Sequence, residues 1–214
     1  MYRTYQPALL STAYLGPIRY FSKFVLHKAV FIEGHENYSK QSYRNRCTIL
    51  TSNGPYNLSI PVKYSNNPKT SIGEVLLDYD TNWNKIHWQA IISAYRNSPF
   101  FEYYSDELEP FYSRKYEKLF DFNQELTTCV LRQMGIETAI MLTSSWESTP
   151  VAVDDYRNDI HPKPHKNKGD QHFREIPYTQ VFQSKFGFVS GLSVLDLLFN
   201  AGPEASVLLE QSIK

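Results

Sequence analysis

Apolar and polar residues alternate along this chain in blocks that predict strands and helices in turn. An apolar run at Ala8–Tyr14 predicts a buried strand, which Gly16-Pro17 ends. The apolar residues of Ile18–Leu26 then fall on one helical face, and the proline before them suits the first position of a helix. A second apolar run, Ala29–Ile32, predicts another strand. A strand, loop, helix and strand in this order predict two parallel strands joined by a crossover.

The same pattern continues to the carboxyl end of the chain. Asn53-Gly54 between two β-type runs is typical of a hairpin. The further predicted strands are Cys47–Leu50, Tyr56–Val62, Ile72–Tyr79 and Thr138–Leu142. The further predicted helices are Thr81–Asn97, Phe111–Phe120, a helix from a cap at Asp121 to Met134 that Gly135 closes, Val194–Phe199, and a last one after Gly202-Pro203. We therefore expect an α/β fold: a single domain over residues 1–214 with a mixed β-sheet flanked by helices.

Two stretches lack any period. Lys63–Lys69 is polar and predicts a loop. Residues 149–178 are rich in Asp, Pro, His and Lys, and we expect a long, mobile loop there.

Composition narrows the class of protein. The 214 residues are 42% hydrophobic, enough for a real core, and carry 16 Tyr and 13 Phe, whose polar-tipped or apolar rings suit both a core and groove walls. Lys and Arg together balance Asp and Glu at 22 each, which argues against a nucleic-acid partner. The two cysteines lie far apart in the sequence, so we expect no disulfide framework. The chain has no apolar run long enough for a membrane span. We therefore expect a cytoplasmic location with reduced thiols. Dinucleotide and P-loop motifs are missing, so we expect no cofactor.

The polar stretch Glu33–Arg46 follows the second predicted strand and holds two Glu, two Tyr, one Lys and two Arg. Lys40, Arg44 and Arg46 place three cations within seven residues, as in sites that bind phosphate or carboxylate. Neighbouring Tyr and Asn side chains suit a sugar or base. The alternative is a solvated loop in which the arginines pair with Glu33 and Glu36.

Two residues are candidates for a general base. Glu36 lies just past a strand, a common position for one, and its alternative role is to neutralise a nearby arginine. His87 lies on the apolar side of its predicted helix, where it is either an acid–base group or a satisfied core histidine. Tyr95 lies on the same helix, and a place in the core is its alternative role. The predicted substrate-binding residues are Tyr14, Glu33, Tyr38, Lys40, Tyr43, Arg44, Asn45, Arg46 and Tyr95.

A late group of histidines, His161, His165 and His172, has aspartates nearby. Its proline-rich spacing lacks the fixed i, i+4 geometry of a helical metal site. We therefore predict no metal site, and interpret the segment as an irregular loop or an active-site lid. A metallohydrolase built on these histidines is the alternative.

An ordered set of residues resembles the WbqC-like family over roughly residues 10–135. The matching positions are Tyr14, Pro17, Tyr20-Phe21, Tyr38-x-Lys40-x-x-Tyr43-x-Asn45-Arg46-x-x-Ile49, Pro61-Val62, Trp83-x-x-x-His87 and Tyr95-x-x-x-Pro99-x-Phe101. The chain departs from the family where Ser11-Thr12 replace Gln-Pro, where Ile18 replaces Trp, and where Glu33 and Glu36 replace Asp. The resemblance implies a role in making or modifying a nucleotide-linked sugar or a surface glycan by acyl or aminoacyl transfer.

These observations lead to two hypotheses of different class. The first is a transferase that binds a phosphorylated small molecule, with the cations of Glu33–Arg46 on the anion and Glu36 or His87 as base. The second is a non-catalytic binding or assembly protein that uses the basic, Tyr-rich loop and residues 149–178 as an interface. The sequence leaves the reaction and the oligomeric state open.

Overall fold

The computed structural model describes residues 6–63 and 69–214. Most of the polar loop predicted at Lys63–Lys69 lies outside the described residues. The chain opens with the predicted unit: strand β1 (Ala8–Ser11), helix α1 (Ile18–Leu26) and strand β2 (Ala29–Glu33). The two strands pair in parallel, with Leu10 opposite Ile32. The crossover unit read from the sequence is therefore confirmed.

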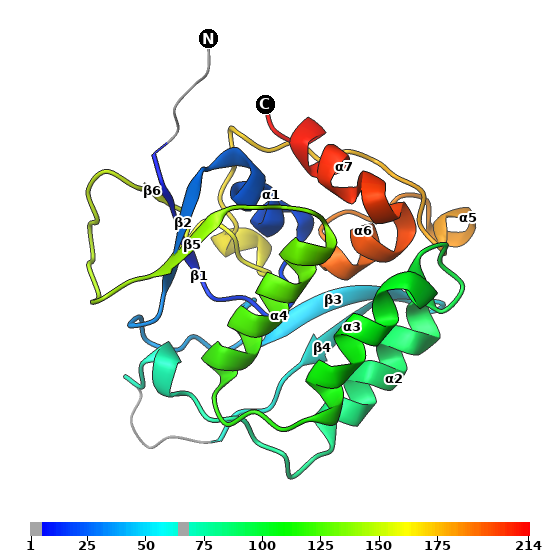
Figure 1. Ribbon diagram of the computed structural model, residues 1–214, viewed down its shortest axis with the longest axis horizontal. Coiled ribbons are helices and arrows are strands. Elements are labelled where there is room, and N and C mark those ends of the chain that lie inside the picture. Colours follow the sequence, from blue (N-terminus) through cyan, green and yellow to red (C-terminus); the bar gives the residue numbers. More distant parts are fainter. Residues whose placement is uncertain (1–5, 64–68) are drawn as a thin grey trace.

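Four parallel strands form the main sheet in the order β5-β2-β1-β6 (Figure 1). Strand β5 (Ala139–Leu142) pairs with β2, and the short β6 (Asp154–Asp155) pairs with β1. The predicted hairpin forms a separate antiparallel sheet from β3 (Arg46–Thr51) and β4 (Gly54–Ser59). The predicted α/β architecture with flanking helices is confirmed, and its parallel and antiparallel pairings lie in two different sheets.

Helices surround these two sheets. The longer ones are α2 (Trp83–Tyr95), α3 (Phe101–Ser113), α4 (Leu119–Gln133), α6 (Val194–Ala201) and α7 (Ala205–Gln211). The short ones are η1 (Ile72–Glu74), η2 (Pro164–Lys166), α5 (Gln183–Phe186) and η3 (Gly202–Glu204). Helix α1 packs against α6 and α7, whereas α2 contacts both α3 and strand β3 (Figure 1). Their buried faces build one aromatic-rich core.

The strand predicted at Ile72–Tyr79 is wrong. Ile72–Glu74 is a single 3₁₀ turn, followed by isolated bridges. The amide of Gly73 donates to the carbonyl of Gly34 at 3.1 Å, and that carbonyl oxygen lies only 2.9 Å from the position a Cβ on Gly73 would take. Gly73 has no Cβ and thus permits this close approach of two backbones.

The helix predicted at Phe111–Phe120 is also wrong. Helix α3 ends at Ser113 and α4 begins at Leu119, so an irregular link divides the predicted span. Tyr112, Tyr116 and Leu119 are buried as expected, but they come from two helices and their connection. The helical spacing of apolar residues therefore continues through the irregular link between two separate helices. Asp121 is not the predicted cap, because α4 begins two residues earlier and Asp121 lies inside its first turn. A negative charge there interacts favourably with the helix dipole.

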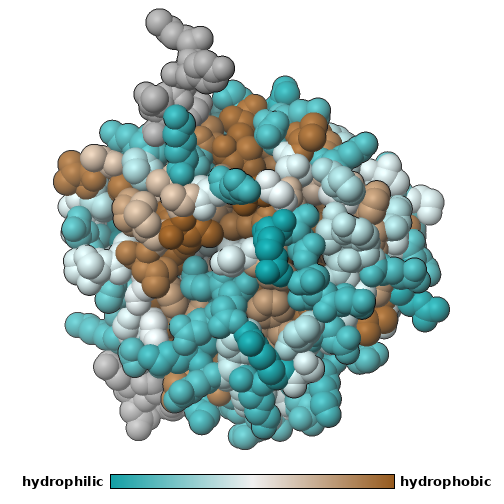
Figure 2. Space-filling view, viewed as in Figure 1, coloured by the Kyte–Doolittle hydropathy of each residue, from teal (hydrophilic) through white to brown (hydrophobic). Residues whose placement is uncertain are grey.

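The outer edge of β5 carries exposed apolar side chains. Met141 and Leu142 are exposed on the strand itself, and Trp146 and Val151 are exposed in the segment that follows. Figure 2 shows brown surface gathered on the side of the molecule where β5 lies in Figure 1. This edge is one of the places where the protein presents apolar surface to solvent.

Candidate functional site

The polar residues of interest gather at the carboxyl edge of the parallel sheet. The chain passes from β1 to β2 to β5 in one direction, and then returns to place β6 on the other side of β1. The strand order therefore reverses between β1 and β6. Open α/β sheets bind ligands in the crevice at such a reversal, just past the carboxyl ends of the strands.

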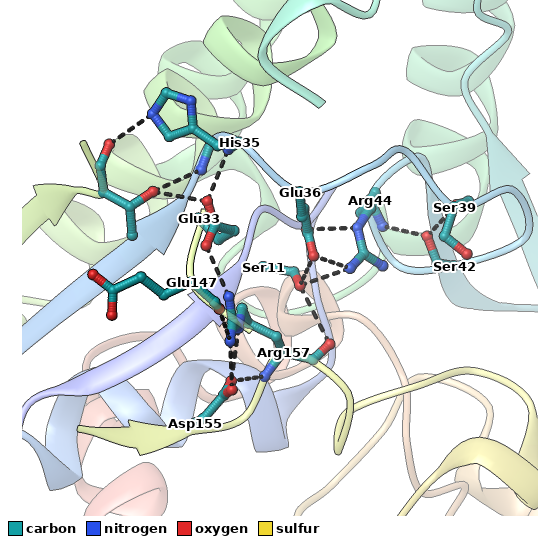
Figure 3. Close-up of polar contacts among 12 residues, drawn as sticks. Ser11, Glu33, His35, Glu36, Ser39, Ser42, Arg44, Glu147, Asp155 and Arg157 are labelled. Carbon is teal, nitrogen blue, oxygen red and sulfur yellow. Dashed lines mark hydrogen bonds and ion pairs between the residues drawn. The ribbon is translucent and has the colours of Figure 1, made fainter. Parts of the chain in front are cut away.

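A buried ion pair joins β2 to the segment after β6. The guanidinium of Arg157 donates to Glu33 at 2.9 Å and also contacts Asp155 at 2.7 Å (Figure 3). The side chains of Arg157 and Glu33 are each only 1% exposed. Burial alone would lower the pKa of Arg157, but its bonds to Asp155 and Glu33 outweigh burial and raise it. Arg157 is therefore a fixed cation that ties residues 154–157 to the sheet.

A second ion pair lies beside the first. Nε and Nη2 of Arg44 donate to the two carboxylate oxygens of Glu36 at 2.7 and 2.6 Å. Nη2 also donates to Oγ of Ser11 at 2.8 Å, and that hydroxyl lies 3.1 Å from Glu36. Figure 3 shows Ser11 between the two ion pairs. Ser11 is the last residue of β1, so the strand end itself enters the network.

The structure shows whether the arginines of Glu33–Arg46 pair with glutamates of the same stretch. Arg44 pairs with Glu36, as the solvated-loop alternative expected, but the pair is buried. Glu33 pairs with an arginine from a distant part of the chain. Bidentate carboxylate pairing fixes the plane of each guanidinium and reduces the charge it can offer to a ligand.

A small pocket opens onto both arginines. It lies between the end of β1 and the segment after β6, and its volume is about 10 Å³, space for about one water molecule. Its lining residues are Leu10, Ser11, Thr12, Ala13, Tyr20, Tyr43, Arg44, Tyr156, Arg157 and Ile160. We call this the β1–β6 pocket. It occupies the crevice that the strand order marks.

A profile of the WbqC-like protein family matches residues 12–161, well over half of the chain. The chain belongs to the WbqC-like family. A curated relative, named as uncharacterized protein Rv1507c of Mycobacterium tuberculosis, is 27% identical over 223 residues, covering 92% of this chain and 94% of the relative. No solved structure matches the chain.

In this WbqC-like protein, Tyr14 and His87 lie together in the core rather than at the pocket. The hydroxyl of Tyr14 lies 2.9 Å from Nδ1 of His87 and 3.0 Å from the hydroxyl of Tyr112. Burial lowers the pKa of His87 to about 4, although a hydrogen bond with the backbone of Ser59 opposes the shift. Burial also raises the pKa of Tyr14. This is the arrangement of a satisfied core histidine.

Asn45, Arg46 and Tyr95 hold the hairpin in place. Asn45 donates to the carbonyl of Ile60, and Arg46 donates to Oγ of Ser59 at 3.1 Å. The hydroxyl of Tyr95 accepts from the amide of Leu50, and the ring is fully buried. Arg44 and Arg46 therefore have different partners, Glu36 and Ser59, and they do not converge on a common anion site.

The remaining loop residues lie nearer the surface. Burial raises the pKa of Tyr38 and of Tyr43 to about 12, with Arg44 and Arg46 opposing the shift at Tyr38. Lys40 is exposed. Of the predicted residues, the structure brings Tyr43 and Arg44 to the β1–β6 pocket, with Glu36 directly behind Arg44.

Sequence reasoning missed Ser11, Asp155 and Arg157 as members of this network. Ser11 stands out in the sequence only as a departure from the WbqC-like pattern, and the other two residues lie in a segment without periodicity. A weak signal did exist, since Asp154-Asp155-Tyr156-Arg157 breaks the polar loop with an aromatic residue and paired charges.

The metallohydrolase alternative finds no support in the geometry. Within residues 6–63 and 69–214, no three His, Cys, Asp or Glu side chains converge as metal ligands. His161 instead accepts from the amide of Lys163, and the nearby Lys168 pairs with Asp159. Across the same residues, no helix is both long and apolar enough to cross a bilayer.

Proposed function

We propose that this WbqC-like protein is a transferase that acts on a phosphate-bearing sugar or acyl donor bound at the β1–β6 pocket. The observation that carries the proposal is the presence of two arginines, Arg44 and Arg157, in one pocket where the strand order reverses. Guanidinium groups on rigid supports suit the oxygens of a phosphate. The setting in surface-polysaccharide or nucleotide-sugar metabolism is what the family resemblance implies.

Arg44 supplies the contact to the donor. Its Nε and Nη2 are engaged by Glu36 and Ser11, and Nη1 has no hydrogen-bond partner within the described chain. A phosphate or carboxylate oxygen can therefore bind at Nη1 without breaking the existing ion pair. Tyr43 lines the same pocket and offers an aromatic face and a hydroxyl to a sugar or base.

Glu36 acts as the base in this proposal, through Ser11. The Ser11 hydroxyl lies 3.1 Å from the Glu36 carboxylate and also lines the pocket. An attacking hydroxyl or amine gives its proton to Oγ of Ser11 as the serine proton moves to Glu36. The acceptor then forms its bond to the transferred group while the donor phosphate or thiol leaves with the bonding electrons.

The donor requires more space than the pocket now offers. Ligand pockets usually measure several hundred Å³, far above the present 10 Å³. Tyr156, Arg157 and Ile160 form one wall, and all belong to the segment predicted to be mobile. Arg157 is anchored to Glu33, so we infer that the part of residues 149–178 beyond Arg157, which carries Ile160, acts as a lid that moves when the donor binds.

A thermal-shift panel tests this function. Nucleotide sugars, sugar phosphates and acyl-thioester donors are added to the wild type, Arg44→Lys, Ser11→Ala and Arg46→Lys, each compared with its own melting temperature without ligand. We expect at least one phosphorylated ligand to stabilise the wild type and the Arg46→Lys control. Arg44→Lys should lose most of that stabilisation, because lysine lacks the third guanidinium nitrogen. The proposal fails if no phosphorylated ligand stabilises the wild type.

Transfer itself is measured as product formation with the donor identified in the panel. Ser11→Ala should retain binding and lose turnover by about 10²-fold or more, the usual contribution of a positioned proton acceptor. Equal turnover in Ser11→Ala and wild type would remove Ser11 from the mechanism.

The exposed apolar edge at β5 favours a second candidate function, that of a binding or assembly protein. Val151 is 87% exposed and Trp146 is 47% exposed, which is costly unless another surface covers them. In that case the wild type would co-purify with a partner, and Leu142→Ser with Val151→Ser would release it while ligand binding stayed unchanged. Failure of the double variant to change any association would count against this candidate.

A further inference from the structure

A second, larger cavity lies where α1, β6 and residues 169–172 meet. Its volume is about 320 Å³, within the range of small-ligand sites. Four aspartates line it, Asp154, Asp155, Asp159 and Asp170, together with Arg19 of α1 and the ring of Tyr156. Tyr156 also lines the β1–β6 pocket, so the two spaces have a wall residue in common. We call this space the α1–β6 cavity.

A buried cluster of charges holds one wall of the cavity. The carboxylate of Asp170 contacts Nζ of Lys23 at 2.5 Å and Nε of Arg19 at 3.0 Å, and its side chain is 4% exposed. Burial would raise the pKa of Asp170, but these two cations outweigh burial and lower it. Segment 167–170 is therefore fixed against α1, and the cavity has a preformed wall.

Three of the four aspartates are already neutralised. Asp170 has Lys23 and Arg19, Asp155 has Arg157 at 2.7 Å, and Asp159 has Lys168 at 2.9 Å.

Asp154 differs from these three. Among the described residues, its nearest ion-pair partner is Nδ1 of His27 at 3.8 Å, and its side chain is 39% exposed. Burial lowers the pKa of His27, which keeps that imidazole neutral near neutral pH. Asp154 is thus the carboxylate with charge left to offer a ligand.

Arg19 contributes a complementary donor. Its Nε and Nη1 are bonded to Asp170 and to Oδ1 of Asn167, but Nη2 is buried without a hydrogen-bond partner. A buried donor without a partner costs about 1–3 kcal/mol. Nη2 is enclosed by protein, so a ligand oxygen in the cavity reaches it only when the guanidinium shifts toward the cavity. The cavity therefore combines one uncommitted carboxylate with one uncommitted N–H group.

We propose that the α1–β6 cavity binds an amino sugar, with its ammonium on Asp154 and a hydroxyl or ring oxygen on Nη2 of Arg19. One sugar ring fits a cavity of this volume, and carboxylates, a guanidinium and an aromatic ring are groups that bind polyhydroxylated ligands. This inference rests on the proposed transfer function, since it makes the amino sugar the acceptor of the transferred group. The ammonium held by Asp154 has no lone pair, so the attacking group is a hydroxyl of the sugar. The position next to Tyr156 brings the acceptor to the side of the donor pocket.

The test uses the full-length protein and monosaccharides as probes. Glucosamine, N-acetylglucosamine and glucose are titrated near neutral pH, with binding followed by amide chemical shifts in NMR spectra. We expect glucosamine to bind about tenfold more tightly than the other two, because they lack the cation that pairs with Asp154. The shifts should concentrate on residues 154–159 and 169–172.

Matched variants separate this site from general charge effects. Asp154→Asn should abolish the preference for glucosamine, and Asp106→Asn, an exposed aspartate on α3, should leave it intact. Equal binding of the three sugars, or a preference that survives in Asp154→Asn, would overturn the inference. Absence of binding by all three sugars would overturn it as well. If any of these results is obtained while a nucleotide sugar still stabilises the wild type in the thermal-shift panel, the amino-sugar inference fails and the proposed donor function remains.

Discussion

Two arginines and two glutamates lie buried side by side at the carboxyl edge of the sheet, and each arginine is held by a glutamate. Taking four charges out of water is costly, and their mutual contacts offset that cost only while every partner is present. Such pairs add little to net stability, yet the loss of one member leaves a bare charge in the core. At the scale of single residues, this explains how polar groups remain at fixed positions beside the β1–β6 pocket.

Removing Arg157 tests this dependence. Arg157→Ala should lower the free energy of unfolding by about 3–5 kcal/mol, because Glu33 is then buried without its cation. Arg132→Ala is the control, since it breaks an exposed pair with Glu107 and should cost less than about 1 kcal/mol. Denaturant unfolding monitored by circular dichroism measures both. Similar losses for the two variants would contradict the account.

His87 predicts a pH dependence of stability. The folded protein holds its pKa at about 4, below the ordinary value of 6.5, so the unfolded chain binds the proton more readily. The contribution of neutral His87 to the free energy of unfolding is therefore fully present above about pH 6.5. It is lost as the pH falls towards 4. The difference between these pKa values corresponds to roughly 3 kcal/mol.

His87→Gln supplies the comparison for that prediction. Urea unfolding at several pH values should show wild type losing roughly 3 kcal/mol more than His87→Gln between pH 6.5 and 4. Other histidines are common to both proteins and cancel in the difference. Parallel stability curves for the two proteins would show that His87 titrates normally in the fold.

At the scale of elements, glycines decide how several helices end. Gly135 follows α4 with φ of +67°, and Gly202 follows α6 with φ of +56°. Both backbones have a positive φ, which glycine adopts without strain. The ψ of Gly202 is −125°, outside the left-handed helical region. The two sites differ in their surroundings, because a Cβ on Gly202 would lie 2.5 Å from the ring of Phe100, whereas one on Gly135 would meet nothing within 4 Å.

This difference gives a matched pair of substitutions. Gly135→Ala should cost about 1–2 kcal/mol from backbone strain alone. Gly202→Ala should cost at least about 1 kcal/mol more, because the Phe100 ring must move as well. Thermal unfolding of the two variants measures the difference. Equal costs would mean that the ring yields freely and that α6 is loosely packed against the start of α3.

At the scale of the whole molecule, the segment 149–178 connects the sheet edge to α1. Arg157 fixes its first part to Glu33, and Asp170 fixes its last part to Lys23. The residues between these anchors include the exposed Lys166 and Lys168. A segment attached at both ends and exposed between them suits a lid over the two cavities, and its mobility remains a prediction.

Releasing the second anchor tests the lid. Asp170→Asn should expose the bonds after Lys166 and Lys168 to trypsin and raise their cleavage rate about tenfold or more over wild type. The variant also loses stability, because Lys23 is then buried without its carboxylate. Asp159→Asn removes only the exposed pair with Lys168 and serves as the control. Unchanged cleavage in Asp170→Asn would show that other contacts hold the segment.

Much of the fold follows from local sequence. Helix α1 has the predicted bounds because its apolar residues share one face. Pro17 directly precedes the helix as its N-cap and does not occupy the predicted first helical position. The hairpin formed because Asn53-Gly54 suits the turn between its strands, and Gly135 closed its helix as predicted. Strand β6 could not be predicted in this way, since two residues are too few to show a period.

The site depends on contacts that no local pattern contains. The sequence by itself placed Tyr43, Arg44 and Glu36 in one polar stretch after β2, because residues close in the chain remain close in space. Only the tertiary structure decided that Arg157, 124 positions after Glu33, is its partner, and that Tyr14 and His87 turn into the core. Charges separated so far in sequence meet only when the sheet is complete, since the burial that makes them pair is a property of the assembled fold.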